Sequence, residues 1–305
     1  MAVLSTGKQI SMTPSDVVQT FGRSVVQHGR CNDRAYLMKL DSLDMPRIIE
    51  TLDGLAARHG YSKIFAKVPR SQLPAFERAG YRLEALVPGF FAGLEDGAFL
   101  GKYMTEERKT DPARPTILAN LEAARSRAAV RAPALDGKGP RIRLASERDV
   151  DAMAHLFRTV FTTYPFPIQD PEYLRETMET HVRYFCIEHD GEIIAASSAE
   201  MDRSSRCVEM TDFATLPQQR GRRLAAHLLA FMERDPAIAM YRNAYTIARA
   251  LSVGVNVTFA RLGYTFAGIL TQNTNISGQI ESMNVWYKPL SASPVLGSAV
   301  AGASC

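Results

Sequence analysis

A basic loop between a strand-like segment and an amphipathic segment is the part of the sequence best suited to chemistry. It lies in TDFATLPQQRGRRLAAHLLAFME (residues 211 to 233), where Arg220, Gly221, Arg222 and Arg223 separate the two patterns. N–H groups at a helix start lack intrahelical acceptors, and the helix dipole adds about half a positive charge there. A bound diphosphate needs a close backbone approach, which Gly221 provides, and counter-charge, which the arginines provide. The sequence therefore predicts a diphosphate-binding loop.

The composition is that of a globular protein and argues against several partners. The 305 residues suffice for two domains, and the net charge of +4 comes from 36 basic and 32 acidic residues spread along the chain. A nucleic-acid binder concentrates its cations on one face, so we expect no nucleic acid. No apolar run approaches the length of a membrane span, and no signal-peptide core opens the chain, so we expect a cytoplasmic protein without membrane contact.

The cysteines predict neither a metal site nor a disulfide framework. Cys31, Cys186, Cys207 and Cys305 show no CxxC spacing, and Cys186 and Cys207 lie inside apolar strand-like runs. Buried reduced thiols are the expected outcome, and no metal is expected.

Hydrophobic periodicity predicts two α/β units. In the first unit, strands at NDRAYLMKL, YSKIFAKVP, YRLEALVPGFF and GAFLGKYM accompany a helix with Ile48, Ile49, Leu52, Leu55 and Ala56 on one face and Gly60 as its stop. Charged, Ala- and Pro-rich sequence then predicts a helical or loose linker. The expected boundaries are 1–110 for the N-terminal domain, 111–138 for the linker, 139–290 for the second domain and 291–305 for a loose tail.

The second unit follows the order β-α-α-β-β-β-α-β-α-β-β. Its first helix has apolar residues at Val150, Met153, Ala154, Leu156 and Phe157, and Asp190-Gly191 is the expected turn of a hairpin. The two units also contain a similar twelve-residue segment at a constant offset of 183 residues, FERAGYRLEALV (76–87) and FARLGYTFAGIL (259–270). We interpret the N-terminal domain as a degenerate half-repeat of the second, without the arginine loop.

The loop resembles a known coenzyme-binding motif. ATLPQQRGRRLAAHLL resembles the acetyl-coenzyme A loop of the GNAT acetyltransferases, Arg/Gln-x-x-Gly-x-Gly/Ala, with Arg220 and Ala225 at its ends and Arg223 where the middle glycine is usual. NVTFARLGY resembles the family's Asn-x-x-Ala helix. With the element order, this predicts a GNAT fold, a mixed central sheet with flanking helices, preceded by a smaller half-GNAT-like α/β domain. Acetyl-CoA is the implied cosubstrate.

A narrower resemblance covers about residues 30 to 290. MTDFATLP, TYPFPIQDPEYL, TQNTNISGQIESMNVWYK and the N-terminal GYSKIFAKVP and AGYRLEALVPGFF resemble the β-lysine N-acetyltransferase family. The resemblance implies direct transfer of acetyl from acetyl-CoA to β-lysine, giving the compatible solute N6-acetyl-β-lysine. Two alternatives stay open: acetylation of another amine (a polyamine, an amino acid or a protein lysine), and an inactive CoA-binding regulatory protein. The oligomeric state is also open, a homodimer included.

The resemblance assigns the coenzyme to the end of one strand, the basic loop and one later helix. Backbone groups of the strand would hold the pantetheine arm where the family's sheet splays open. Phe259 stands where many family members have a tyrosine acid, so another group such as Tyr264 or a water would serve, or the thiolate leaves unprotonated. The expected coenzyme-binding residues are Phe213, Ala214, Thr215, Arg220, Gly221, Arg222, Arg223, Leu224, Ala225, Asn256 and Phe259.

The proton acceptor is expected on the same strand. In the histone-acetylating branch a catalytic Glu stands four residues before the first coenzyme contact, and Glu209 has that place relative to Phe213. Strand alternation predicts Asp212 on one face of the strand and, on the other, Glu209, Thr211, Phe213 and Thr215. Asp212 is the second catalytic candidate, as an anchor for a substrate ammonium. A surface carboxylate or a salt bridge is the competing interpretation of Glu209.

Acceptor-binding residues are expected from two segments. TYPFP lies in the region that closes over the acceptor in this superfamily, so Tyr164 and Phe166 are candidate walls. The polar run TQNTNISGQIES offers Gln272, Asn273, Asn275 and Glu281, although such runs also form simple turns.

Overall fold

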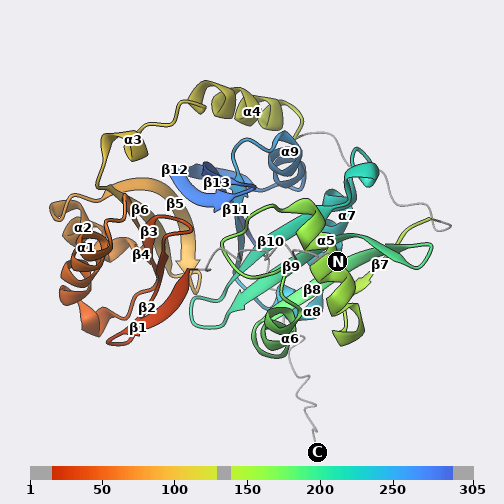
Figure 1. Cartoon of the computed structure of the whole chain (residues 1–305), viewed down its shortest axis with the longest axis horizontal. Helices are drawn as coiled ribbons and strands as arrows, with labels where there is room; N and C mark the ends of the chain where they lie inside the picture. Colours follow the sequence, from red (N-terminus) through yellow and green to blue (C-terminus); the bar gives the residue numbers. More distant parts are fainter. Residues whose placement is uncertain (1–15, 129–138, 291–305) are drawn as a thin grey trace, which may run out of the picture.

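The N-terminal half is a sheet on which two helices pack (Figure 1). The structure, a computed structural model, describes residues 16–128 and 139–290, so the predicted tail (291–305) and part of the predicted linker (129–138) lie outside it, as does 1–15. The elements of this half are β1 (Val17–Phe21), β2 (Ser24–Gly29), β3 (Arg34–Lys39), α1 (Arg47–His59), β4 (Lys63–Pro69), α2 (Leu73–Arg78), β5 (Arg82–Phe91) and β6 (Glu95–Tyr103).

The predicted linker is helical where it is described. After α3 (Glu106–Lys109), α4 (Arg114–Ser126) buries Ile117, Leu121 and Ala124. It packs on a helix of the C-terminal half, α9 (Val253–Arg261), beside which it lies in Figure 1. The segment is therefore part of the packed molecule along this helix.

The C-terminal half has the predicted order of elements, with one additional short helix, α8. They are β7 (Arg141–Leu144), α5 (Val150–Val160), α6 (Pro171–Thr180), β8 (Val182–His189), β9 (Glu192–Asp202), β10 (Cys207–Thr215), α7 (Leu224–Met232), α8 (Pro236–Ala239), β11 (Asn243–Arg249), α9, β12 (Thr265–Ile276) and β13 (Gln279–Pro289). All five apolar positions predicted for α5 are buried. Asp190 and Gly191 take left-handed conformations, φ 50° and 79°, as a tight hairpin turn requires.

The described strands form one mixed sheet of 13 strands that runs through both halves. The spatial order is β1-β2-β3-β4-β6-β5-β12-β13-β11-β10-β9-β8-β7. The runs β4-β6-β5 and β12-β13-β11 mirror each other about the junction, and each is connected as strand, helix and hairpin. The two similar segments, 76–87 and 259–270, lie on equivalent elements of these runs, α2–β5 and α9–β12.

The junction between the halves depends on a close backbone approach. β5 and β12 pair at Ala85 and Gly268, and a Cβ on Gly268 would lie 2.1 Å from the Glu84 carbonyl oxygen. Only glycine fits there without moving a strand. The boundaries at residues 110 and 139 stay predictions.

Buried cations of the N-terminal half also bond three successive carbonyls of β12. Lys63 Nζ donates to the carbonyl of Thr271 (2.7 Å), Arg108 Nε to that of Gln272 (2.7 Å), and Arg34 Nη1 to that of Asn273. Pairing of β12 with β13 is interrupted between Leu270 and Thr274, so these carbonyls lack ladder partners on that side. The N-terminal half therefore fixes the irregular part of β12.

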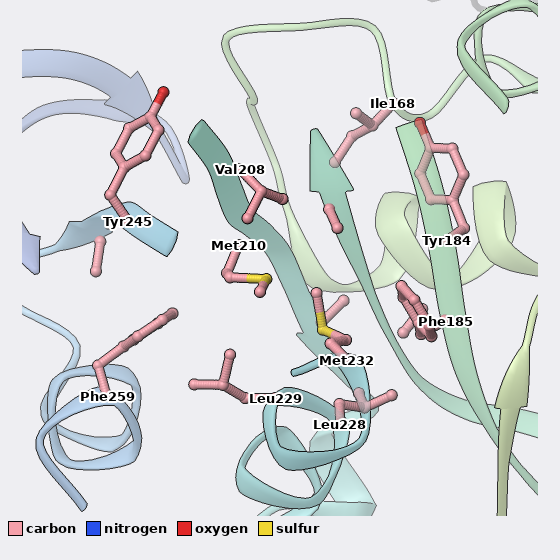
Figure 2. Packing of buried hydrophobic residues seen from close by; sticks show 14 of the residues in the cluster. Ile168, Tyr184, Phe185, Val208, Met210, Leu228, Leu229, Met232, Tyr245 and Phe259 are labelled. Carbon is pink, nitrogen blue, oxygen red and sulfur yellow. The ribbon is translucent and has the colours of Figure 1, made fainter. Parts of the chain in front are cut away.

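The main core lies between the C-terminal strands and α7. Figure 2 shows Met210 of β10, Leu229 and Met232 of α7 and Phe259 of α9 in one apolar cluster, with the Tyr245 hydroxyl pointing away from α7. Each large apolar side chain buried in this way stabilises the fold by roughly 1.5–3 kcal/mol. None of the helices within 16–128 and 139–290 is both long and apolar enough to cross a membrane.

Candidate active site

Strands β10 and β11 separate in the middle of the sheet. They pair in parallel from Cys207 to Glu209 with Asn243 to Tyr245, and beyond that each bonds only to its outer neighbour, β9 or β13. Beyond Glu209, the β11-facing edge of β10 therefore has no strand partner within residues 16–128 and 139–290. Such an edge can bind an extended ligand through main-chain hydrogen bonds.

A bulge at Asp212 reverses the alternation of β10. Asp212 has φ 55°, and the register with β9 shifts so that Thr211 pairs with Ser198 but Ala214 pairs with Ala196. Since residues 196 and 198 share a face of β9, Ala214 lies on the face of Thr211. The predicted alternation is therefore wrong beyond Thr211, because a bulge inserts one residue into one strand.

The basic loop presents unpaired backbone donors at the start of α7. Gly221 and Arg223 are left-handed, φ 84° and 60°, and the carbonyl of Arg223 accepts the N–H groups of Ala226 and His227. The N–H groups of residues 221 to 225 donate to no acceptor within the described ranges. The left-handed conformation of Arg223 explains why glycine is usual there in the motif, since it costs other residues about 1–2 kcal/mol.

A groove of about 510 Å³, which we call the loop groove, starts at this loop. Seven of the predicted coenzyme-binding residues line it: Phe213, Thr215, Arg220, Gly221, Arg223, Leu224 and Ala225. The site of a Cβ on Gly221 has no atom within 4 Å, so a ligand can approach the backbone closely. Arg222 is exposed beside the groove and bonds Gln219, and Ala214 is buried in the core.

Two further predicted coenzyme-binding residues, Asn256 and Phe259, make their contacts inside the protein. Asn256 Nδ2 donates to the carbonyls of Arg249 and Ser252 (2.9 and 2.8 Å), and its Oδ1 accepts from Asn284 and Trp286 (2.8 and 2.9 Å). Asn256 therefore fastens α9 to β11 and β13. It does not line the loop groove.

Phe259 supports the groove from behind. It is fully buried, with edge-to-face contacts to Phe213 (5.5 Å between ring centroids) and Tyr264 (4.9 Å). Tyr264 is buried on the far side of Phe259 and lines neither the groove nor the cavity described next. The structure therefore does not bring Tyr264 to the place of the missing tyrosine acid.

A second hollow, the central cavity of about 130 Å³, lies between the two halves of the chain. The N-terminal half contributes Arg34, Tyr36, Met38, Phe65 and Lys67 to its wall. The C-terminal half contributes, among others, Tyr164, Phe166, Ser198, Glu200, Glu209, Thr211, Asp212, Asn273 and Thr274. Phe161, Phe213, Arg249 and Val255 line both the cavity and the loop groove, so the two meet where β10 and β11 separate.

Glu209 has one hydrogen-bonded oxygen and one unoccupied oxygen. Tyr245 Oη donates to its Oε2 (2.8 Å) and accepts from Lys67 Nζ (3.1 Å), whereas Oε1 has no hydrogen-bond partner in the described structure. Burial, reinforced by Glu200 and opposed by Lys67, raises the pKa of Glu209 to about 7. A carboxyl group with this pKa suits proton transfer near neutral pH.

Lys67 keeps a positive charge beside Glu209. Burial disfavours the ammonium, but Tyr36, Glu209 and Glu200 around it outweigh burial and raise its pKa above the ordinary value. The N-terminal half thus supplies the cation that favours the ionised form of Glu209.

Both carboxylate oxygens of Asp212 accept a hydrogen bond within the protein. Its Oδ1 accepts from Tyr164 Oη (2.6 Å) and its Oδ2 from Ser198 Oγ (2.5 Å). Burial raises the pKa of Asp212 despite these hydrogen bonds. The side chain faces the same cavity as Glu209, so it can orient Tyr164 in the wall.

Only some of the predicted acceptor residues reach the cavity. Tyr164, Phe166 and Asn273 line it. Asn275, Glu281 and Gln272 do not, because each is bonded elsewhere in the protein. Asn275 bonds Cys31 and Thr163, Glu281 forms an ion pair with Arg249 (2.6 Å), and Gln272 donates to the Glu107 carbonyl (2.8 Å).

Sequence reasoning missed Arg34, Lys67, Glu200 and Tyr245. A signal existed for the cations, since Arg34 and Lys67 interrupt apolar strand runs in the N-terminal half. Charged residues inside such strands are rarely buried unless a partner or a ligand compensates them. No local pattern indicates that they lie in one cavity with residues of β10 and β12.

Comparison with known proteins agrees with this geometry. The Acetyltransferase (GNAT) family model matches residues 150–260, which include the separated strands, the basic loop and all of α9 except its last residue. The chain is an acyl-CoA N-acetyltransferase with the GNAT fold.

Relatives similar over most of the chain define the family more narrowly. The β-lysine N(6)-acetyltransferase of Methanococcus maripaludis is 39% identical over 265 residues, which is 87% of this chain and 96% of that protein. The β-lysine N(6)-acetyltransferase of Methanosarcina mazei is 37% identical over 50% of this chain and 56% of its own length. N-acetyltransferase YodP of Bacillus subtilis is 28% identical over 88% of this chain and 96% of its own. The chain belongs to the β-lysine N(6)-acetyltransferase family of GNAT enzymes.

Proposed function

We propose that the chain transfers the acetyl group of acetyl-CoA to N6 of β-lysine by direct attack of the amine. The product is N6-acetyl-β-lysine, and the names of two relatives supply the acceptor. The observation that carries the proposal is the meeting of the loop groove and the central cavity at Phe213. A coenzyme in the groove and an amine in the cavity would reach each other there without a covalent enzyme intermediate.

The loop groove would hold the coenzyme through charge and backbone donors. The N–H groups of residues 221 to 225 and the guanidinium of Arg220 suit the diphosphate. The free edge of β10 from Phe213 to Thr215 suits the amide-bearing pantetheine arm. Acetyl-CoA supplies the acetyl group as an activated thioester.

Glu209 would accept the proton of the attacking amine. An alkyl ammonium with a pKa of about 10.4 is neutral in roughly one molecule in 2,500 at pH 7, a cost of about 4.6 kcal/mol. Glu209 Oε1 accepts no hydrogen bond from the described residues and can take this proton, directly or through one water. Since Phe259 replaces the usual tyrosine, the coenzyme thiolate would leave unprotonated, which a thiol pKa of about 8.5 tolerates.

Release of free thiol tests the proposal. With acetyl-CoA present, β-lysine should give the highest kcat/KM of a panel that includes lysine, spermidine and a lysine-containing peptide. A clear preference for a polyamine or a peptide would assign the site to another amine. Coenzyme binding without thiol release for any amine would favour the regulatory alternative.

A further inference from the structure

Arg34 is a buried cation in the wall of the central cavity with no carboxylate partner among the described residues. Its residue exposure is 3%, and its Nη1 bonds the Asn273 carbonyl and Thr274 Oγ1 (3.2 Å). Nε is buried without an acceptor, and Nη2 has none among the described residues. Burial lowers the pKa of Arg34 to about 10, which still leaves it charged at neutral pH. Leaving such a donor unpaired is costly, so an anionic ligand group is expected.

Arg108 shows what a purely structural arginine looks like in the same region. It also bonds a carbonyl of β12 and is buried, but its Nη1 and Nη2 donate to Ser62 and Asn32 (3.0 and 2.8 Å). Asp33 lies 3.5 Å from it as a counter-charge. Arg108 does not line the cavity, whereas Arg34 lines it and lacks these partners.

Aromatic rings hold the Arg34 guanidinium in place. Its central carbon lies 5.0 Å from the centroid of Tyr36 and 5.7 Å from that of Phe65. Contact with ring faces stabilises the cation and fixes its plane without using its N–H donors. The free donors are therefore positioned before a ligand arrives.

Asn273 adds an unused acceptor to the same cavity wall. Its residue exposure is 1%, and its Oδ1 is buried with no donor among the described residues, while its backbone carbonyl is bonded to Arg34. The unpaired donors of Arg34 and the unpaired acceptor of Asn273, on two hydrogen-bonded residues of one cavity wall, complement a carboxylate with an ammonium close to it.

We propose that Arg34 and Asn273 form the subsite for the head of the acceptor. Arg34 binds the carboxylate, and Asn273 Oδ1 accepts a hydrogen bond from the ammonium on the neighbouring β-carbon. The N-terminal half would then set acceptor specificity. This inference rests on the proposed function, because it takes β-lysine as the substrate.

The layout and charges of the cavity are compatible with this arrangement. Arg34 and Asn273 line the same cavity as Glu209, with Asn273 on β12 and Glu209 on β10. An extended six-carbon substrate bound at Arg34 and Asn273 would direct N6 toward Glu209. The wall carries three carboxylates, Glu200, Glu209 and Asp212, and three cations, Arg34, Lys67 and Arg249. Arg249 is already paired with Glu281, so the charges that remain suit a substrate with two ammonium groups and one carboxylate.

Substrate analogues crossed with variants test the subsite. In 1,4-diaminopentane the carboxylate of β-lysine is replaced by hydrogen, and 6-aminohexanoate lacks only the 3-amino group. The wild type should prefer β-lysine over the diamine by at least about 30-fold in kcat/KM, as for a buried charge pair. Arg34→Gln should abolish this preference, and Asn273→Leu should abolish the preference over 6-aminohexanoate.

Arg108→Gln is the matched control, since Arg108 is a buried arginine that also bonds a carbonyl of β12 but does not line the cavity. It should lower the melting temperature but keep both preferences. A wild type that uses the diamine as well as β-lysine would overturn the subsite even if Arg34→Gln did not fold, as would an Arg34→Gln enzyme that retained the preference. If β-lysine is not acetylated, the proposed function is wrong, and this result does not depend on Arg34. The role of Arg34 is then decided with the amine that is acetylated, by comparing its kcat/KM with that of the same amine without its carboxylate.

Discussion

Replacing Glu209 by Gln tests the proton acceptor most sharply. The amide keeps the shape and the hydrogen bond from Tyr245 but cannot take a proton. General-base catalysis contributes about 10²–10⁴-fold, so kcat at pH 7 should fall by that factor with coenzyme affinity nearly unchanged. In the wild type, kcat/KM should rise with pH to an inflection near 7, the pKa of Glu209.

The variant should lose that inflection. Its rate should instead rise about tenfold per pH unit towards 9.5, because only amine that arrives neutral can react. Steady-state kinetics from pH 6.5 to 9.5 measure both profiles. A carboxylate that only anchors the ammonium would raise KM and spare kcat. An unchanged kcat and KM would refute the assignment and direct the same test to Asp212.

A folding defect would not imitate this result. The folded-state pKa of Glu209, about 7, lies above its ordinary value of 4.5. Any stability from this shift is present below pH 4.5 and is lost as pH rises through 7. Because glutamine does not ionise, the Glu209→Gln variant avoids this decrease in unfolding free energy. At pH 8 the melting temperature of the variant should therefore not fall below that of the wild type.

Four further predictions follow from the site. Lys67→Met removes the cation that favours ionised Glu209, so the inflection in kcat/KM should move up by about one pH unit. An unchanged inflection would show that the N-terminal half does not influence the pKa of Glu209. Arg220→Ala should weaken coenzyme A binding by about 1.5–3 kcal/mol in calorimetry, and unchanged affinity would remove Arg220 from the site. Arg223→Gly should relieve a left-handed residue, raising the unfolding free energy by about 1 kcal/mol while coenzyme affinity falls; lower stability would contradict the strain. A coenzyme titration should saturate at one site per chain, since the N-terminal half has no counterpart of the arginine loop, and two sites would refute this.

Local patterns predicted most of the C-terminal half. The helix face at Val150 to Phe157 and the turn at Asp190-Gly191 follow from periodicity and backbone preference, which act over a few residues. The resemblance to known motifs placed the basic loop and Glu209. The bulge at Asp212 was not predictable in this way, because it depends on the register with β9.

Residues that depend on the joining of the two halves could not be found from local sequence. Arg34 and Lys67 reach the cavity only because β5 pairs with β12 and the sheet continues. Asn256 lies outside the groove because of contacts within the C-terminal half, where its side chain bonds Asn284 and Trp286 of β13. Contacts across such separations leave no periodic signal in a single sequence.

The nitrogen that receives the acetyl group distinguishes the proposed activity from its alternatives. The protein would be incubated with β-lysine and acetyl-CoA carrying a labelled acetyl group, and the product would be analysed by nuclear magnetic resonance. We expect the label on N6, with one equivalent of coenzyme A released per product formed. Attachment to N3, or no product that depends on β-lysine, would contradict this expectation.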